Sequence, residues 1–148
     1  MDFGMTDTQQ AIRELSRQIL EERASHEELS RLEAQDVWHS SATWGALAEA
    51  ELLGLALPEE CGGGDMGLGA LATLMEEIGR AAAPVPVLSH VVGGLALAHD
   101  GAHSEVLASA ATGATLLTVA LVDDEPKCPS TRVEGATLSG VRACVPSW

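Results

Sequence analysis

The spacing of the apolar residues changes once along the chain, at about residue 113. Before that point apolar side chains recur every three or four residues, which is the period of an α-helix that buries one face. After it, residues 115–122 are β-branched and apolar, and residues 131–142 alternate around Gly135 as in a hairpin. The pattern predicts a mainly α fold. An orthogonal or bundle-like helical domain over residues 1–113 is followed by a partial β domain over residues 114–148, because about 35 residues are too few for an independent β domain.

Capping residues and chain breakers predict where the helices begin and end. Thr6 and Gln9 have the spacing of a capping box, and Gly54 is placed to end the third helix as a C-terminal cap. Pro84 is expected to end the fourth helix, and Ser104 to cap the last one. The expected helices run from Asp7 to Ala24, Glu27 to Ala34, Trp44 to Gly54, Leu68 to Ala82, Val87 to Ala98 and Ser104 to Ala111, with a loop between Gly54 and Gly69.

Composition excludes some classes of function. Eight basic and 22 acidic residues give a formal net charge of −14, whereas a nucleic-acid-binding surface needs clustered Lys and Arg. With 46% hydrophobic and only 3% aromatic residues, the chain is expected to be globular, with a core of Ala, Leu, Val and Ile. No uncharged apolar run reaches the roughly 20 residues of a membrane span, and no signal peptide is recognisable. Three widely spaced cysteines indicate neither a disulfide framework nor a CxxC metal site, so the cytoplasm is the expected location.

Gly62, Gly64 and Gly67 match the G-x-G-x-x-G pattern of a dinucleotide-binding turn. Such a turn follows a strand, and an acidic residue comes about twenty positions later. Here no adequate strand precedes the glycines, and residues 78–98 contain no Asp or Glu. The prediction is a flexible loop that leads into a helix.

Histidines and paired carboxylates are the other candidates for chemistry. His99 and His103 have the spacing of two metal ligands on a helix, but Gly101 between them favours a turn. His90 lies in an apolar helix, where a hydrogen-bonded buried histidine is more common than a catalytic base. The pairs at 59–60 and 76–77 are expected to face water, whereas a general acid or base needs burial. The residues alone therefore indicate no catalytic or metal-binding site.

Three phrases, taken together, resemble a known family. They are MTDTQQ at residues 5–10, LLGLALPEECGG at 52–63 and MEEIGR at 75–80. In this order and at about this spacing they are similar to segments of the N-terminal helical domain of the acyl-CoA dehydrogenase family. The resemblance implies a following middle β domain, a C-terminal four-helix domain and FAD bound between subunits. It also implies that the flavin takes a hydride from the β-carbon of an acyl-CoA after a glutamate removes the α-proton.

The segments that match the family include neither the C-terminal domain nor its glutamate. No catalytic residue is therefore assigned in this chain, and activity is expected only in a homo- or hetero-oligomer with a longer related chain. By family position, Glu125 and Val145 are the candidate FAD contacts. The family's aromatic residue and hydroxyl residue are replaced by Cys144 and Pro146, which removes a stacking partner and a hydrogen-bond donor.

The apolar helix from Val87 to Ala98 is the candidate for contact with the acyl chain. Its candidate residues are Leu88, Val91, Val92 and Leu95, and Gly93–Gly94 thin the helix enough for another backbone to approach. The alternative for each of these residues is ordinary helix packing.

Two functions follow from these observations. The first is a subunit or N-terminal portion of an FAD-dependent acyl-CoA dehydrogenase that acts on an acyl-CoA substrate. The second is a non-catalytic interaction subunit that stabilises a full-length acyl-CoA dehydrogenase, which the substitutions at Cys144 and Pro146 favour.

Overall fold

The computed structural model describes residues 4–35, 37–101, 103–120, 122–123, 131–143 and 145. It contains the helices α1 (Asp7–Arg23), α2 (His26–Ala34), α3 (Ser41–Glu49), α4 (Gly67–Arg80), α5 (Val87–His99) and α6 (Ser104–Ala111), and the short 3-10 helix η1 (Glu59–Cys61). The strands are β1 (Val122–Asp123), β2 (Arg132–Glu134), β3 (Thr137–Ser139) and β4 (Arg142–Ala143). The predicted mainly α fold, followed by the start of a β region, is confirmed.

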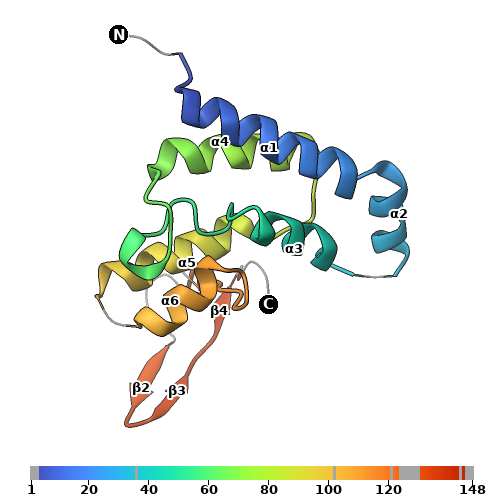
Figure 1. Ribbon diagram of the computed structural model, residues 1–148. Coiled ribbons are helices and arrows are strands. Elements are labelled where there is room, and N and C mark those ends of the chain that lie inside the picture. Colours follow the sequence, from blue (N-terminus) through green and yellow to red (C-terminus); the bar gives the residue numbers. More distant parts are fainter. Residues whose placement is uncertain are drawn as a thin grey trace.

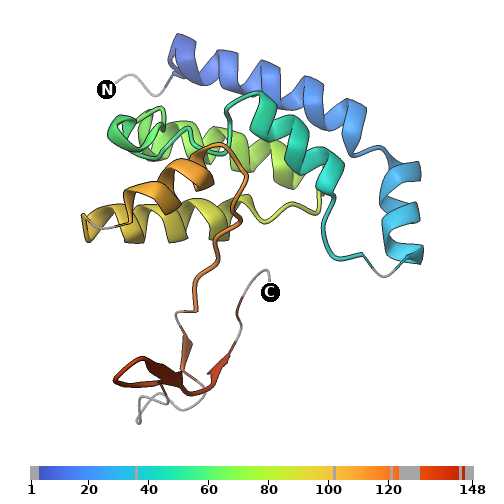
Figure 2. The same ribbon diagram turned by 60° about the horizontal axis from the view of Figure 1, so that its bottom comes forward.

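The helices pack in pairs around one core. α1 lies along α4, and α5 lies beside α6, while α2 stands across the end of α1 (Figures 1 and 2). The buried hydrophobic side chains among the described residues are Leu, Ile, Val, Ala and one Cys, which confirms the core composition expected from the sequence. Across the described segments, no helix is long and apolar enough to cross a membrane.

The start of α1 follows directly from its sequence. The Gln9 N–H donates to Thr6 Oγ1 at 3.2 Å, and the Thr6 N–H donates to Gln9 Oε1 at 2.9 Å, which confirms the capping box. Ile12, Ser16 and Leu20 form the buried face of the helix. The Ser16 hydroxyl is satisfied within the helix, because it donates to the Ile12 carbonyl at 2.6 Å.

Three predicted helix boundaries differ from the structure. α3 ends at Glu49 rather than at Gly54, because Glu51 adopts a left-handed conformation (φ 58°) and residues 52–57 are buried as an irregular segment. Ser104 is the first residue of α6 and not its cap: His103 holds the capping position with φ 72° and makes no side-chain capping bond. α4 also stops at Arg80, two residues earlier than predicted, and Ala82 has φ 49°.

The β region consists of two separate strand pairs. β2 and β3 form a hairpin around Gly135 (φ 61°), as predicted, and this hairpin extends away from the helices in Figure 2. β1 pairs with β4 in antiparallel register. The predicted strand over residues 115–122 is wrong for residues 115–120, which form no strand. Backbone N–H groups there are bonded to the helical body instead: the Thr115 N–H donates to the Ser109 carbonyl at 3.1 Å.

Candidate functional site

The four apolar residues predicted on α5 do not share one environment. Val91 is fully buried in the helical core, whereas Leu88 is 53% exposed. Val92 and Leu95 are partly buried. Leu88, Val92 and Leu95 are spaced by four and three residues and follow one line along α5, which we call the outer stripe. Leu88 is its exposed member, whereas Leu95 also packs against the hydrophobic core, and Val91 beside them is buried in that core.

Gly93 and Gly94 let two other segments approach α5 closely. A Cβ at Gly93 would lie 3.2 Å from the Leu117 Cβ and 3.6 Å from the Thr118 carbonyl oxygen. A Cβ at Gly94 would lie 2.7 Å from a methyl of Leu57. The expectation that another backbone approaches α5 here is confirmed, and that backbone is the chain's own segment leading to β1.

His90 joins three parts of the chain. Its Nδ1 accepts a hydrogen bond from the Leu117 N–H at 3.1 Å, so its Nε2 carries the proton and donates to the Ala110 carbonyl at 3.1 Å. The Trp44 ring meets the imidazole edge-on at 4.9 Å, and its Nε1–H donates to the Gly113 carbonyl at 3.0 Å. Burial lowers the pKa of His90, and the bond to Ala110 opposes that shift. The prediction of a buried, hydrogen-bonded histidine is confirmed.

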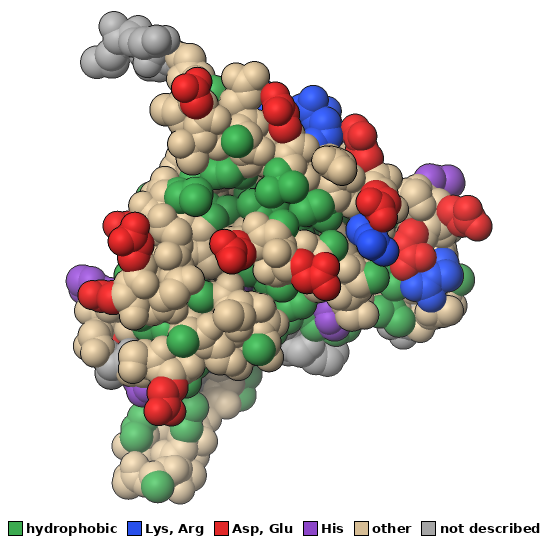
Figure 3. Space-filling view, in the orientation of Figure 1, with side chains coloured by type: hydrophobic (Ala, Val, Ile, Leu, Met, Phe, Trp, Pro, Cys, Tyr) green, Lys and Arg blue, Asp and Glu red, His purple; other side chains and the backbone are tan. Residues whose placement is uncertain are grey.

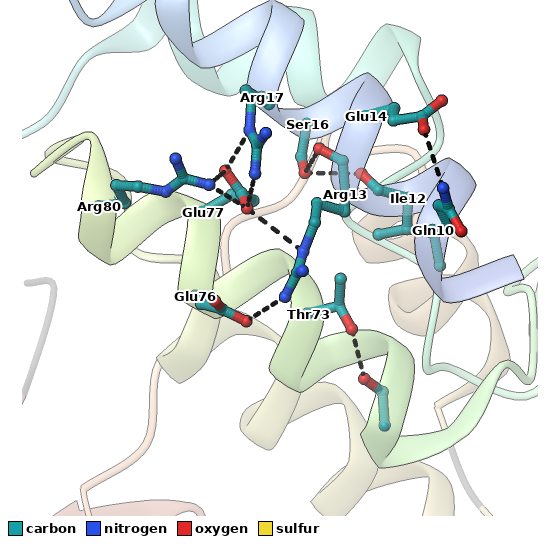
Figure 4. Close-up of polar contacts among 11 residues, drawn as sticks. Gln10, Ile12, Arg13, Glu14, Ser16, Arg17, Thr73, Glu76, Glu77 and Arg80 are labelled. Carbon is teal, nitrogen blue, oxygen red and sulfur yellow. Dashed lines mark hydrogen bonds and ion pairs between the residues drawn. The ribbon is translucent and has the colours of Figure 1, made fainter. Parts of the chain in front are cut away.

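Glu77 is a buried carboxylate at the contact between α1 and α4 (Figure 4). Its side chain is 2% exposed, and Arg17 donates to both of its oxygens at 3.0 and 3.2 Å. Arg80 donates to the same oxygens at 2.6 and 2.7 Å. Glu76, by contrast, is 60% exposed and pairs with Arg13 at 2.6 Å. The prediction that the pair faces water is therefore right for Glu76 and wrong for Glu77.

These arginines keep Glu77 ionised. The hydrogen bonds from Arg17 lower the pKa of the Glu77 carboxyl, desolvation opposes that shift, and Arg80 adds to it. A carboxylate whose oxygens all accept bonds from guanidinium groups is a poor general base, so the cluster holds α1 against α4. One sequence feature could have indicated this cluster. The i, i+4 spacing of Arg13 and Arg17 puts both cations on one face of α1, where they can meet a carboxylate of another helix.

The glycine loop binds its own backbone. The Gly62, Gly63 and Gly64 N–H groups donate to the carbonyls of Glu59, Pro58 and Gly54, at 2.9 to 3.0 Å. Donors that are already satisfied in this way are not aimed at a phosphate, and the 3-10 helix η1 precedes them rather than a strand. A turn at Gly101 (φ 68°) separates the histidines at 99 and 103. Within the part of the chain that the structure describes, no cluster of three His, Cys, Asp or Glu residues suits a metal ion.

Of the two candidate flavin contacts, the structure describes only Val145. Glu125 lies outside the described residues, as do Cys144 and Pro146. Val145 follows β4 and is partly buried. The Val145 side chain has no hydrogen-bonding group, so it could make only apolar contact with a flavin ring. Any hydrogen bond to the flavin would come from the Val145 backbone.

A surface groove of about 470 Å³ lies between α1, the segment after α3 and the glycine loop. Its lining includes the buried side chains of Ile12, Leu52 and Leu55 and the exposed side chains of Leu15 and Met66. Figure 3 shows hydrophobic side chains gathered in this region below α1, with acidic side chains on both sides. The sequence did not indicate this groove, because its walls come from segments up to about 100 residues apart.

Comparison with known proteins gives consistent matches. The profile described as "Acyl-CoA dehydrogenase, N-terminal domain" matches residues 6–113. Acyl-CoA dehydrogenase FadE28 of Mycobacterium tuberculosis is 32% identical over 152 residues, covering 98% of this chain and 39% of FadE28.

Two solved structures resemble the chain as a whole. A variant of the steroid ACAD Tcur3481-Tcur3483 superposes with a TM-score of 0.83 at 37% identity, covering 93% of this chain and 41% of that one. The ChsE4-ChsE5 complex from Mycobacterium tuberculosis superposes with a TM-score of 0.86 at 29% identity, covering 98% of this chain and 42% of that one. The chain thus spans about two-fifths of the length of the relatives it matches.

Proposed function

The chain belongs to the acyl-CoA dehydrogenase family, and we propose that it is a subunit, or the N-terminal portion of one, of an FAD-dependent acyl-CoA dehydrogenase. The observation that carries the proposal is the match of its helical body to the family's N-terminal domain over residues 6–113. In this proposal residues 1–113 form that domain, and residues 114–148 are the beginning of the middle β domain.

The enzyme is active as an assembly with a longer related chain. Both structural neighbours bear the names of two proteins, and one of them is titled a complex. The longer chain supplies the catalytic base and most of the flavin contacts, and this chain adds Glu125 and Val145. The assembly works in the cytoplasm, where the buried free thiol of Cys61 stays reduced.

The substrate is a steroid-derived acyl-CoA thioester. One neighbour is titled a steroid ACAD, and it is 37% identical to this chain over 93% of its length. The outer stripe of α5, formed by Leu88, Val92 and Leu95, contacts the apolar part of the substrate, and Val91 supports the stripe from the core side. Members of this family generally use FAD, which when bound supplies the hydride acceptor for the dehydrogenation.

An anaerobic titration of the native complex tests this function. The chain is purified from its host with the subunits that accompany it, and the visible spectrum is recorded while a steroid acyl-CoA is added. The proposal predicts a flavin band that bleaches in proportion to the added substrate, whereas the free steroid acid leaves the band unchanged. A colourless complex that stays colourless with added FAD contradicts the proposal.

The second candidate is a non-catalytic subunit that only stabilises a complete acyl-CoA dehydrogenase. The observation in its favour is that Cys144 and Pro146 stand where the family has an aromatic residue and a hydroxyl residue. In this case the companion chain alone bleaches with acyl-CoA, and removing this chain lowers the companion's melting temperature without changing its substrate affinity.

A further inference from the structure

We propose that the groove beside α1 is the docking site for a basic amphipathic helix of the companion subunit. The inference rests on the proposed function, since it assumes that a companion exists.

The wall formed by α1 has the pattern of a helix-packing surface. Thr8, Ala11, Ile12 and Leu15 line the groove, and their spacing of three, one and three residues puts them on one face over two turns. Side chains at these positions pack against a second helix by ridges into grooves. The small Ala11 leaves room for a close approach between the two helices.

The groove exposes apolar surface that has no cover within the described chain. Leu15 is 42% exposed and Met66 is 49% exposed, while Ile12, Leu52 and Leu55 below them are almost fully buried. Exposed apolar side chains in a groove with charged residues at its edge suit the apolar face of an amphipathic helix. The exposed Leu15 and Met66 are therefore the expected anchors for the incoming helix.

The charges around the groove select a basic partner. Glu49 and Glu51 are the charged residues in its lining, and both are exposed. Arg13 and Arg17 on α1 do not neutralise them, because both are paired with carboxylates of α4. A second copy of this chain is a poor occupant, since its net charge of −14 would oppose association.

A small ligand is a poorer fit than a helix. Ligand pockets combine apolar walls with a few convergent polar groups that orient the ligand. Here the N–H groups of Gly62, Gly63 and Gly64, which line one side, are already bonded within the loop. The groove is an open apolar trough with an acidic edge, which suits an apolar helix face flanked by Lys or Arg.

Affinity measurements on the separated and remixed subunits test the site. The dissociation constant is measured for wild type, Leu15→Asp, the double variant Glu49→Gln/Glu51→Gln, and the matched control Glu27→Gln/Glu33→Gln on α2. We expect Leu15→Asp to weaken binding by about thirtyfold. The groove double variant is expected to weaken it roughly fivefold and to reduce its salt dependence, with no change in the control. Far-UV circular dichroism checks that each variant is folded.

A cross-link identifies the occupant. A photoreactive phenylalanine analogue is placed at Leu15 and, as control, at Val106, which is 39% exposed on α6. The expected product at position 15 is a companion peptide with apolar residues at helical spacing and flanking Lys or Arg. A cross-link to another copy of this chain, or to an acidic or non-helical segment, overturns the inference. If groove variants bind like wild type, the inference fails while the proposed function stands. If no companion associates at all, both fail.

Discussion

The Leu117 N–H donates a hydrogen bond to Nδ1 of His90 at 3.1 Å, although the two residues are 27 positions apart. The other ring nitrogen of His90 is bonded to Ala110 at the end of α6. A single neutral imidazole thus fixes α5, α6 and the segment that leads from the helices toward β1. Protonation of Nδ1 would remove the acceptor that holds the Leu117 N–H.

Acid is predicted to weaken this junction. Because burial lowers the pKa of His90, the unfolded chain binds more protons than the folded chain once the pH drops below the ordinary value of about 6.5. The free energy of unfolding is expected to fall as the pH decreases from about 6.5 and to level off below the folded-state pKa. His90→Gln keeps one donor and one acceptor but does not titrate there. Urea denaturation at pH 7.5 and pH 5.5 is expected to show a smaller pH effect in the variant, and an equal effect contradicts the assignment.

Glu77 is predicted to stabilise the contact between α1 and α4. Glu77→Gln leaves Arg17 and Arg80 without their counter-charge and is expected to lower the free energy of unfolding by about 1–3 kcal/mol. Because the pKa of Glu77 is lowered, its contribution is fully present above the ordinary pKa of a glutamate and is lost as the pH falls through the folded-state pKa. The control is Glu76→Gln on the same turn, which is exposed and should have a much smaller effect. Thermal denaturation of both variants measures the difference, and equal losses argue against burial as the cause.

Gly63 is predicted to be irreplaceable in the glycine loop. A Cβ at this position would lie 2.2 Å from the Leu57 carbonyl oxygen, so Gly63→Ala forces the backbone to move. We expect a loss of at least about 2 kcal/mol in stability. Gly79→Ala is the comparison, because nothing lies within 4 Å of a Cβ there and α4 should gain about 0.5–1 kcal/mol. A Gly63→Ala protein as stable as wild type in a melting experiment is inconsistent with this geometry.

The outer stripe of α5 is predicted to act on substrate affinity. Val92 is only partly buried, so Val92→Trp should change the melting temperature little. In the assembled enzyme it should raise the acyl-CoA dissociation constant about tenfold, a change of roughly 1.4 kcal/mol in binding free energy. Val106→Trp on α6 controls for adding an exposed indole. An unchanged dissociation constant with a lowered melting temperature would show that Val92 serves only packing.

Local signals in the sequence predicted the helices well. The capping box at Thr6 and the chain break at Pro84 depend only on neighbouring residues, and both α1 and α5 begin where expected. The predicted end of α3 at Gly54 is wrong because Glu51, and not a glycine, adopts the left-handed conformation that follows the helix. The helix ends there because residues 52–57 are buried as an irregular segment, and the spacing of apolar residues does not reveal that burial.

Contacts between distant residues account for the other differences. Residues 115–120 have β propensity, but their segment is bonded to His90 and packs on Gly93 instead of forming a strand. The sequence predicts that Glu77 faces water, because its partner Arg17 lies on α1, sixty residues earlier, and only the folded chain brings the two together. The groove beside α1 also arises only when these segments come together.

Reconstitution of flavin reduction tests whether this chain is a working part of an acyl-CoA dehydrogenase. The companion subunit is separated from this chain, and the rate of bleaching of its flavin band by a steroid acyl-CoA is measured under anaerobic conditions before and after this chain is added back. We expect little bleaching with the companion alone and full recovery at a fixed stoichiometry of the two chains. Equal bleaching rates and equal acyl-CoA affinities with and without this chain would contradict it.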